Sequence, residues 1–203
     1  MNDRLVWIDC EMTGLDLATD ALIEVAVLVT DYELNVLSEG IDLVIAPPPA
    51  ALEQMGDFVR DMHTASGLLA ELPKGIALAD AEQQVLDFIA SYVPDPRKAA
   101  LAGNSVGTDR TFLVRDMPKV ESHLHYRNVD VSSIKELVRR WYPRVYYATP
   151  AKTGNHRALA DITESIAELR YYRQTVFVPQ PGPDTDTAKA AAASLVSDPI
   201  SGN

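Results

Sequence analysis

Short apolar runs and short turns alternate along the first 45 residues. The runs cover residues 4–9, 22–30 and 36–45 and are rich in β-branched and aliphatic side chains, a composition typical of strands. The connections between them are short and carry Gly, Asp and Asn, which favours antiparallel neighbours. We therefore predict an antiparallel meander of three strands at the start of the chain.

Beyond the three prolines at 47–49 the apolar spacing becomes helical. From Asp80 onward, apolar residues recur every three or four positions. Asp80 and Gln83 together resemble a capping box at the start of this helix. Later elements are predicted as a strand at 99–102, a glycine-bounded turn at 103–107, a helix from about Thr108, a strand at 129–131, a helix capped by Ser133 and Glu136, and a helix from about His156 to Tyr172. Strands followed by alternating helices and strands predict an α/β domain, a mixed sheet flanked by helices.

Composition supports one globular domain, because the 203 residues are 47% hydrophobic and 23% charged. From residue 179 onward the chain has no aromatic residue, and half of residues 187–196 are alanine. We expect a domain at 1–178 and a flexible C-terminal tail at 179–203 with transient helix.

The chain has no apolar run of the roughly 18 residues that a membrane span needs, and its first residues do not resemble a secretory signal. Its one cysteine, Cys10, has no partner for an internal disulfide, which fits a reducing compartment. We therefore expect a cytoplasmic protein without membrane contact.

Charge restricts the substrate class. The chain has 18 basic and 29 acidic residues, a net charge of −11, which disfavours tight binding of long polyanions. Residues 127–157, however, carry seven Lys or Arg against only Asp130 and Glu136. This local basic segment suits a small anionic substrate, and the alternative is a solvated helix face.

Four carboxylates occur where separate elements end or begin. Asp9 and Glu11 end the first apolar strand and lie two residues apart, which places both on the same face at its carboxyl end. Asp109 lies at a predicted helix start, and Asp161 lies beside the apolar stripe of the last long helix. Each has an ordinary structural explanation alone, but together they suit Mg²⁺ or Mn²⁺, and two such ions about 4 Å apart can promote in-line attack at phosphorus.

His156 precedes Asp161 by five residues, which is a rotation of about 140° within one helix. We therefore place His156 at the junction of loop and helix, where it could act as a general base toward water. An ordinary histidine at a helix start is the alternative.

Taken in order, Asp9-x-Glu11, Asp109 and His156-x4-Asp161 resemble the catalytic pattern of the DEDDh 3′-to-5′ exonucleases, which have a ribonuclease H-like fold. Residues 4–175 carry the resemblance. Its longest segments resemble the oligoribonuclease branch of that family and are Trp7-Ile-Asp-Cys-Glu-Met-Thr-Gly-Leu15, His63-Thr-Ala-Ser-Gly-Leu68, Gly103-Asn-Ser-Val-Gly-Thr-Asp109 and Tyr126-Arg-Asn-Val-Asp-Val-Ser132.

The resemblance implies a homodimer that removes 5′-mononucleotides from RNA of two to five nucleotides, with dinucleotides preferred. It implies that Asp9, Glu11, Asp109 and Asp161 bind two divalent cations, Mg²⁺ or Mn²⁺, and that His156 is the general base.

The same resemblance assigns substrate-binding residues. It places Leu15 and Phe58 around the bases, His63, Ser105, Arg127 and Ser132 near the phosphates, and Tyr126 in the site of the neighbouring subunit. Stacking on Phe58, where the family more often has tryptophan, is tolerant of base sequence. Core packing of Phe58 and interface packing of Tyr126 are the alternatives.

Two other functions remain open from the sequence. A broader trimming or proofreading exonuclease would share the fold and the carboxylates but would accept long substrates. A noncatalytic protein that binds nucleotide messengers would have no use for four converging carboxylates, which repel an anionic ligand in the absence of metal.

Overall fold

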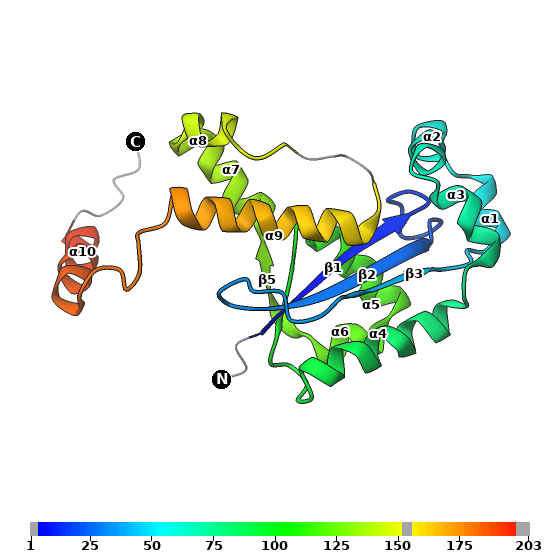
Figure 1. Ribbon diagram of the computed structural model, residues 1–203, viewed down its shortest axis with the longest axis horizontal. Coiled ribbons are helices and arrows are strands. Elements are labelled where there is room, and N and C mark those ends of the chain that lie inside the picture. Colours follow the sequence, from blue (N-terminus) through cyan, green and yellow to red (C-terminus); the bar gives the residue numbers. More distant parts are fainter. Residues whose placement is uncertain (1–3, 152–155, 198–203) are drawn as a thin grey trace.

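The computed structural model describes residues 4–151 and 156–197. Its centre is a five-stranded sheet in the order β3-β2-β1-β4-β5 (Figure 1). The strands are β1 (Arg4–Met12), β2 (Leu22–Asp31), β3 (Ile41–Val44), β4 (Ala100–Gly103) and β5 (His125–Asp130). β1, β2 and β3 pair antiparallel, whereas β4 pairs parallel to β1 and β5 parallel to β4. The prediction of a mixed sheet that begins with an antiparallel meander is therefore confirmed.

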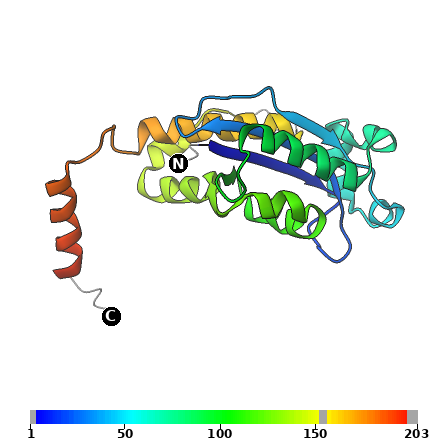
Figure 2. The ribbon, with the colours of Figure 1, turned by 90° about the horizontal axis from the view of Figure 1, so that it is seen from below.

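Helices cover both faces of this sheet (Figure 2). The helices before β4 are α1 (Pro49–Glu53), α2 (Asp57–Ala65), α3 (Leu68–Glu71), the 3₁₀ helix η1 (Leu72–Lys74) and α4 (Leu78–Tyr92). Those after β4 are α5 (Gly107–Asp116), α6 (Pro118–His123), α7 (Val131–Trp141), α8 (Pro143–Tyr147), α9 (Ala158–Thr175) and α10 (Thr185–Ser197). The result is a three-layer α/β arrangement.

The central strand β1 supplies side chains to both cores because successive residues point to opposite faces. Leu5 and Trp7 are buried against α7 and α9, and Val6 and Ile8 are buried against α4, α5 and α6. Asp9 continues the odd-numbered set, so the alternation directs its carboxylate toward the α9 side.

Several local predictions differ from the structure. β1 continues through Met12, three residues beyond the predicted run at 4–9, and β3 is shorter than the predicted run. The strand predicted at 129–131 is β5, which already begins at His125. Neither predicted capping box forms. α4 begins at Leu78 without a side-chain cap, and Asp130 caps α7 by accepting a hydrogen bond from the Ser132 backbone N–H. An Asp next to the first turn was available as a cap, so the Ser133 and Glu136 pattern was not needed.

The last helix, α10, lies apart from the sheet and its covering helices in Figures 1 and 2. Its described side chains, residues 185–195, are all exposed. Of the helices in the described part of the chain, none is both long and apolar enough to cross a membrane.

The exposure of this segment leads to a stability prediction. A chain that ends at Val178 loses few buried contacts, so we expect its melting temperature to stay within about 2 °C of the full-length value. Thermal unfolding followed by circular dichroism tests this. A decrease of more than about 5 °C would show that residues 179–203 pack against the domain.

Candidate active site

Two strand-borne carboxylates and one helix-borne carboxylate meet at the end of β1. Asp9 and Glu11 lie two residues apart within β1. Asp109 lies in the first turn of α5, and its Oδ1 accepts a hydrogen bond from the Cys10 backbone N–H at 3.0 Å. This bond fixes the start of α5 against the strand between Asp9 and Glu11.

The fourth carboxylate and the histidine come from the beginning of α9. Asp161 lies in its first turn, and ligand atoms of Glu11, His156 and Asp161 all lie within 4.8 Å of one another. His156 precedes the helix and has a φ of 48°, a left-handed conformation that is uncommon outside glycine. Its position at the junction of loop and helix is the one that the angular argument predicts.

The carboxylates are protonated more readily than in water. Burial raises the pKa of Asp9 to about 9, and the charges of Asp109, Glu11 and Asp161 contribute. Burial, with the charges of Asp161 and Glu24, raises the pKa of Glu11 to about 8. Burial raises the pKa of Asp109 to about 7 against the opposing effect of the hydrogen bond from Cys10. The site therefore favours either protons or a bound cation.

The donor set determines which cation fits. Asp9, Glu11, Asp109 and Asp161 offer carboxylate oxygens, and the neighbouring thiol of Cys10 has its pKa raised by burial, which disfavours the thiolate that soft metals prefer. Hard divalent ions such as Mg²⁺ and Mn²⁺ match such an oxygen-rich set. A dication would also offset the cost of burying these charges and their mutual repulsion, the two effects that raise the pKa values of Asp9 and Glu11.

An ion-pair network that the sequence did not reveal holds the segment next to His156. Glu24 is fully buried in β2, and it accepts hydrogen bonds from Arg157 Nε at 2.7 Å and from the Ala158 backbone N–H at 2.9 Å. Arg157 also pairs with Glu71 at 3.0 Å. The one sequence signal was a Glu in the middle of an otherwise apolar run, because such a residue needs a buried partner.

Phe58 is not a core residue. It is 81% exposed on α2, and it lines a pocket of about 550 Å³ together with His156 and Arg157. Leu15 is 73% exposed on the connection between β1 and β2. The alternative of core packing for Phe58 is therefore wrong, and its ring is free to stack on a planar group.

His63 lies beneath the carboxylates. It is fully buried, its Nε2 lies 2.9 Å from the Met12 carbonyl oxygen, and its Nδ1 lies 4.0 Å from Glu11 Oε2. Among the described residues, Nδ1 has no hydrogen-bond partner. Burial lowers the pKa of His63, which favours the neutral imidazole. This ring contacts the Glu11 carboxylate from the protein interior.

Ser105 and Ser132, here called the serine pair, lie at the carboxyl edge of the parallel strands. Their hydroxyl oxygens are 3.0 Å apart, and Asp130 Oδ1 accepts hydrogen bonds from both backbone N–H groups, at 3.1 and 2.8 Å. Ser105 has a φ of 52°. Strained φ values cluster at functional sites, and here two candidate site residues, Ser105 and His156, share this feature.

Tyr126 and Arg127 lie at the other end of the sheet. His125 pairs with Ala100, which pairs with Leu5, and Asp9 lies four residues further along β1, a separation on the order of 13 Å. One chain therefore does not bring Tyr126 and Arg127 to its own carboxylates.

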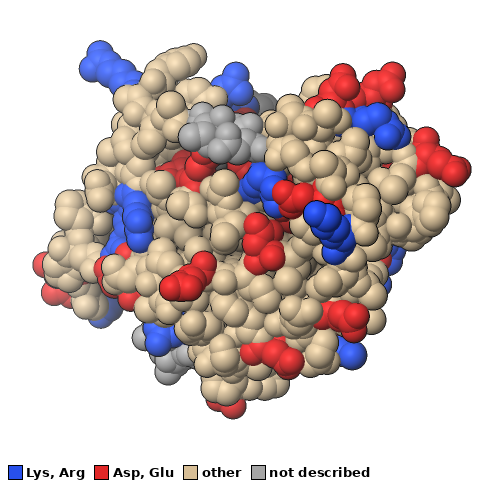
Figure 3. Space-filling model, turned by 45° about the vertical axis from the view of Figure 1, so that its right-hand side comes forward, with Lys and Arg blue, Asp and Glu red and all other residues tan. Residues whose placement is uncertain are grey.

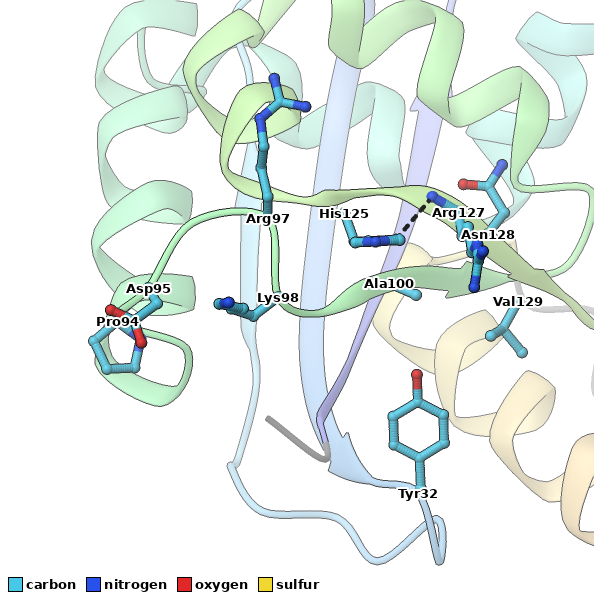
Figure 4. Close-up of a pocket in the computed structure, with 10 residues that line it drawn as sticks. All are labelled: Tyr32, Pro94, Asp95, Arg97, Lys98, Ala100, His125, Arg127, Asn128 and Val129. Atoms are coloured by element: carbon cyan, nitrogen blue, oxygen red, sulfur yellow. Dashed lines mark hydrogen bonds between the residues drawn. The ribbon is translucent and has the colours of Figure 1, made fainter. Parts of the chain in front are cut away.

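A pocket of about 1030 Å³ lies beside these residues. Figure 4 shows it between Tyr32, which comes from the loop after β2, and strands β4 and β5, with Lys98 entering from the loop before β4. Arg127 lines it and donates a hydrogen bond from Nε to the Tyr126 hydroxyl at 3.2 Å.

Charged side chains of both signs are mixed on the surface. On the face shown in Figure 3, Lys and Arg side chains lie singly among Asp and Glu side chains, and those of the described residues form no continuous basic track there. Such a face offers a long polyanion little favourable electrostatic contact.

Solved structures share this fold. Exonuclease I in a product-bound form matches with a TM-score of 0.62 and 16% identity, covering 86% of this chain and 44% of that one. The zinc-bound E. coli exonuclease I in complex with single-stranded DNA matches with a TM-score of 0.61 and 18% identity, covering 87% of this chain and 41% of that one. The chain thus spans less than half the length of these proteins, and the likeness establishes a ribonuclease H-like fold.

Sequence relatives cover nearly the whole chain. The exonuclease family of the RNase T type matches residues 6–169. The oligoribonuclease of Streptomyces coelicolor is 71% identical over 97% of this chain and 98% of that protein. The oligoribonuclease of Mycobacterium avium is 60% identical over 96% of this chain and 91% of that protein. The chain therefore belongs to the exonuclease family and, within it, to the oligoribonucleases.

Proposed function

We propose that this protein is a 3′-to-5′ exoribonuclease that degrades very short RNA, from two to five nucleotides with a preference for dinucleotides, to 5′-mononucleotides. The observation that carries the proposal is the convergence of buried carboxylates and His156 beside a pocket lined by the exposed ring of Phe58. Carboxylates, a base and a stacking platform are the parts that hydrolysis of a terminal phosphodiester needs.

Asp9, Glu11, Asp109 and Asp161 would bind two divalent cations, Mg²⁺ or Mn²⁺. When bound, the cations supply Lewis-acid stabilisation of the phosphate and of the leaving oxygen. The raised pKa values of Asp9 and Glu11 fit this role, because a carboxylate set that repels itself gains most from a positive charge.

His156 accepts a proton from the water that attacks the terminal phosphorus. The new P–O bond forms as the bond from phosphorus to the 3′-oxygen of the preceding nucleotide breaks, and that oxygen leaves with a proton from solvent. The terminal nucleotide departs as a 5′-monophosphate. Arg157, held between Glu24 and Glu71, keeps His156 at the start of α9 during this step.

The serine pair and the base-stacking residues set the substrate length. Leu15 and Phe58 are exposed apolar side chains that can enclose the bases. Ser105 and Ser132 offer hydroxyl groups to a 5′-terminal phosphate, whereas His63 supports the carboxylate side of the site through its 4.0 Å contact with Glu11. A site that encloses the 5′-terminal phosphate leaves no room for further nucleotides on that side, and it therefore favours dinucleotides over longer RNA.

A second copy of the chain would complete each site. Tyr126 is 67% exposed, and Trp141 and Leu137, one turn apart on α7, are also exposed. An exposed group of large apolar side chains is typical of a contact surface. Since Tyr126 and Arg127 lie far from their own carboxylates, a homodimer that presents them to the neighbouring site gives both a function.

The proposal places the enzyme in the cytoplasm, in keeping with its single, buried and unpaired Cys10. It assigns catalysis to residues 1–178 and no catalytic role to the predicted tail at 179–203, which contains α10 and whose last residues, 198–203, lie outside the described part of the chain.

The length dependence of cleavage tests the central claim. With 5′-labelled RNAs of two, three, five and twenty nucleotides and Mn²⁺, we expect the dinucleotide to be cleaved fastest and EDTA to abolish cleavage. Asp161→Asn should lower kcat by at least about 100-fold without loss of the fold, whereas Asp186→Asn on exposed α10 should have no effect.

Two outcomes would replace this function by an alternative. Equal rates on the dinucleotide and the twenty-nucleotide RNA would indicate a general trimming exonuclease. Tight dinucleotide binding without cleavage would indicate a noncatalytic messenger-binding protein.

The buried carboxylates predict how stability depends on pH. Because folding raises the pKa of Asp9 to about 9 and of Glu11 to about 8, the metal-free folded state holds more protons than the unfolded state between about pH 4 and pH 9. Its stability therefore falls as pH rises, and we expect the melting temperature in EDTA to drop by roughly 5 °C from pH 5.5 to 8.5.

Saturating Mn²⁺ should remove most of this drop, and Asp9→Asn should flatten the pH dependence of the metal-free protein. Differential scanning fluorimetry across that pH range measures both effects. A metal-free melting temperature that rises with pH would contradict the assignment.

The shared site predicts complementation between inactive variants. Tyr126→Ala should lower dinucleotide turnover at least about 10-fold with little change in melting temperature. Mixing it with Asp161→Asn should restore roughly one quarter of wild-type activity, because half of the dimers are mixed and each has one complete site. Normal turnover by Tyr126→Ala alone, or no recovery on mixing, would argue against a site completed by the partner.

A further inference from the structure

A continuous chain of hydrogen bonds connects the serine pair to α9, and Asn104 is its centre. Asn104 lies in the turn between β4 and α5. Its Oδ1 accepts a hydrogen bond from Ser132 Oγ at 3.0 Å. Its Nδ2 donates to Ser165 Oγ at 2.7 Å and to Glu168 Oε2 at 3.3 Å. One amide thus contacts the candidate phosphate-binding hydroxyls on one side and α9 on the other.

The α9 side fixes which way this amide points. Glu168 is buried, and its carboxylate also pairs with Lys135 Nζ at 3.1 Å, so it can only accept hydrogen bonds. Ser165 is also buried and donates its single hydroxyl hydrogen to the Asp161 carbonyl oxygen at 2.8 Å. Both groups therefore require the NH₂ of Asn104, which leaves its oxygen to face Ser132.

The amide orientation in turn fixes the hydroxyl hydrogens of the serine pair. Because Asn104 Oδ1 has no hydrogen to give, Ser132 must donate its only hydroxyl hydrogen to it. Ser132 Oγ can then only accept in its 3.0 Å contact with Ser105 Oγ, so Ser105 is the donor in that contact. An anion that approaches the pair finds one hydrogen that can turn outward, that of Ser105.

We propose that Asn104 is a positioning residue that determines specificity for the substrate's 5′ end: it holds Ser132 as an inward-pointing donor and leaves the Ser105 hydroxyl to donate to a terminal phosphate. The proposal rests on the proposed function, because it assigns the serine pair to the 5′-phosphate of a short RNA. Turning the Ser105 hydrogen outward breaks no bond made by Asn104, so the phosphate gains a donor without disturbing α9.

The backbone of Ser105 supports this role. Its left-handed φ of 52° costs conformational energy in a residue with a Cβ. The hydrogen bond from its backbone N–H to Asp130 Oδ1, which also accepts from the Ser132 N–H, holds that conformation. A turn that served only to connect β4 to α5 would be built more easily with glycine at this position.

The chain of hydrogen bonds that runs through Asn104 ends at Asp161, one of the proposed metal ligands. Ser165 donates to the carbonyl oxygen of Asp161, the α9 residue whose carboxylate lies with Glu11 and His156. Asn104 therefore holds the serine pair, which faces the 5′ end of the substrate, in a fixed position relative to α9, which carries Asp161.

Two substrates separate this role from a general structural one. The first is a dinucleotide with a 5′-phosphate, and the second is the same dinucleotide with a 5′-hydroxyl. We expect Asn104→Ala to lower kcat/KM on the phosphorylated dinucleotide roughly 10-fold, mainly through KM, because the hydroxyl groups of the serine pair are then no longer held in one donor arrangement, and this loss of positioning is comparable to a charge-assisted hydrogen bond. It should change kcat/KM on the 5′-hydroxyl dinucleotide less than about 2-fold.

A third substrate and a control variant complete the design. The p-nitrophenyl ester of thymidine 5′-monophosphate presents a scissile phosphate without a 5′-terminal phosphate, so Asn104→Ala should hydrolyse it at the wild-type rate. Ser165→Ala removes one of the two acceptors for Asn104 Nδ2 but leaves Glu168, so it should retain the preference for the phosphorylated dinucleotide. Melting temperatures of both variants confirm that they fold.

The possible results differ in what they overturn. An equal loss on all three substrates would make Asn104 a structural residue only, and unchanged kinetics on the phosphorylated dinucleotide would likewise refute the proposal. If the wild-type protein itself showed no preference for short RNA, the proposed function would fail, and that result is seen before any variant is compared.

Discussion

Repulsion between buried carboxylates is the constraint on which the rest of this structure depends. Asp9, Glu11 and Asp109 have raised pKa values because burial removes the water that would stabilise their charged forms, and the negative charges around them add to this effect. A protein that only needed stability would not place them together. Their surroundings can be understood as a scaffold that holds an unfavourable charge arrangement in place until a cation compensates it.

The carboxylates are held in place by elements that are far apart in sequence. β1 fixes two of the carboxylates by its pleat, α5 is joined to it by the bond from Cys10 to Asp109, and α9 is joined to β2 through the buried Glu24. Each attachment pairs a buried polar group with a defined partner, which is the condition under which such a group does not destabilise the fold. The candidate catalytic groups therefore lie on rigid elements, whereas Leu15 and Phe58, which are proposed to contact the bases, are exposed.

Local patterns in the sequence were sufficient to predict the mixed sheet and where the candidate carboxylates and His156 lie on its elements. The meander followed from short apolar runs, and the shared face of Asp9 and Glu11 followed from the two-residue period of a strand. The position of His156 ahead of the helix followed from its spacing to Asp161. These features depend on residues within a few positions of one another, so one sequence contains them.

The partners of the buried polar groups could not be predicted in this way. Glu24 meets Ala158 across 134 residues, and Asn104 meets Ser165 across 61, so neither pair has a local signature. The two capping boxes were wrong because a backbone turn or a neighbouring Asp satisfied the helix start instead. His63 was assigned to the substrate by resemblance alone, and its full burial beneath Glu11 depends on packing that only the fold brings about.

Cys10 lies between the two candidate metal ligands of β1, yet the pleat turns its side chain into the opposite core, among Val6, Ile8 and Val25. Burial also raises the pKa of its thiol, so the sulfur stays protonated and out of reach of solvent. Peroxides and disulfides react with accessible thiolates, and the only sulfhydryl in the chain is neither. The strand that carries two of the candidate catalytic carboxylates is thereby insulated from the redox state of its surroundings.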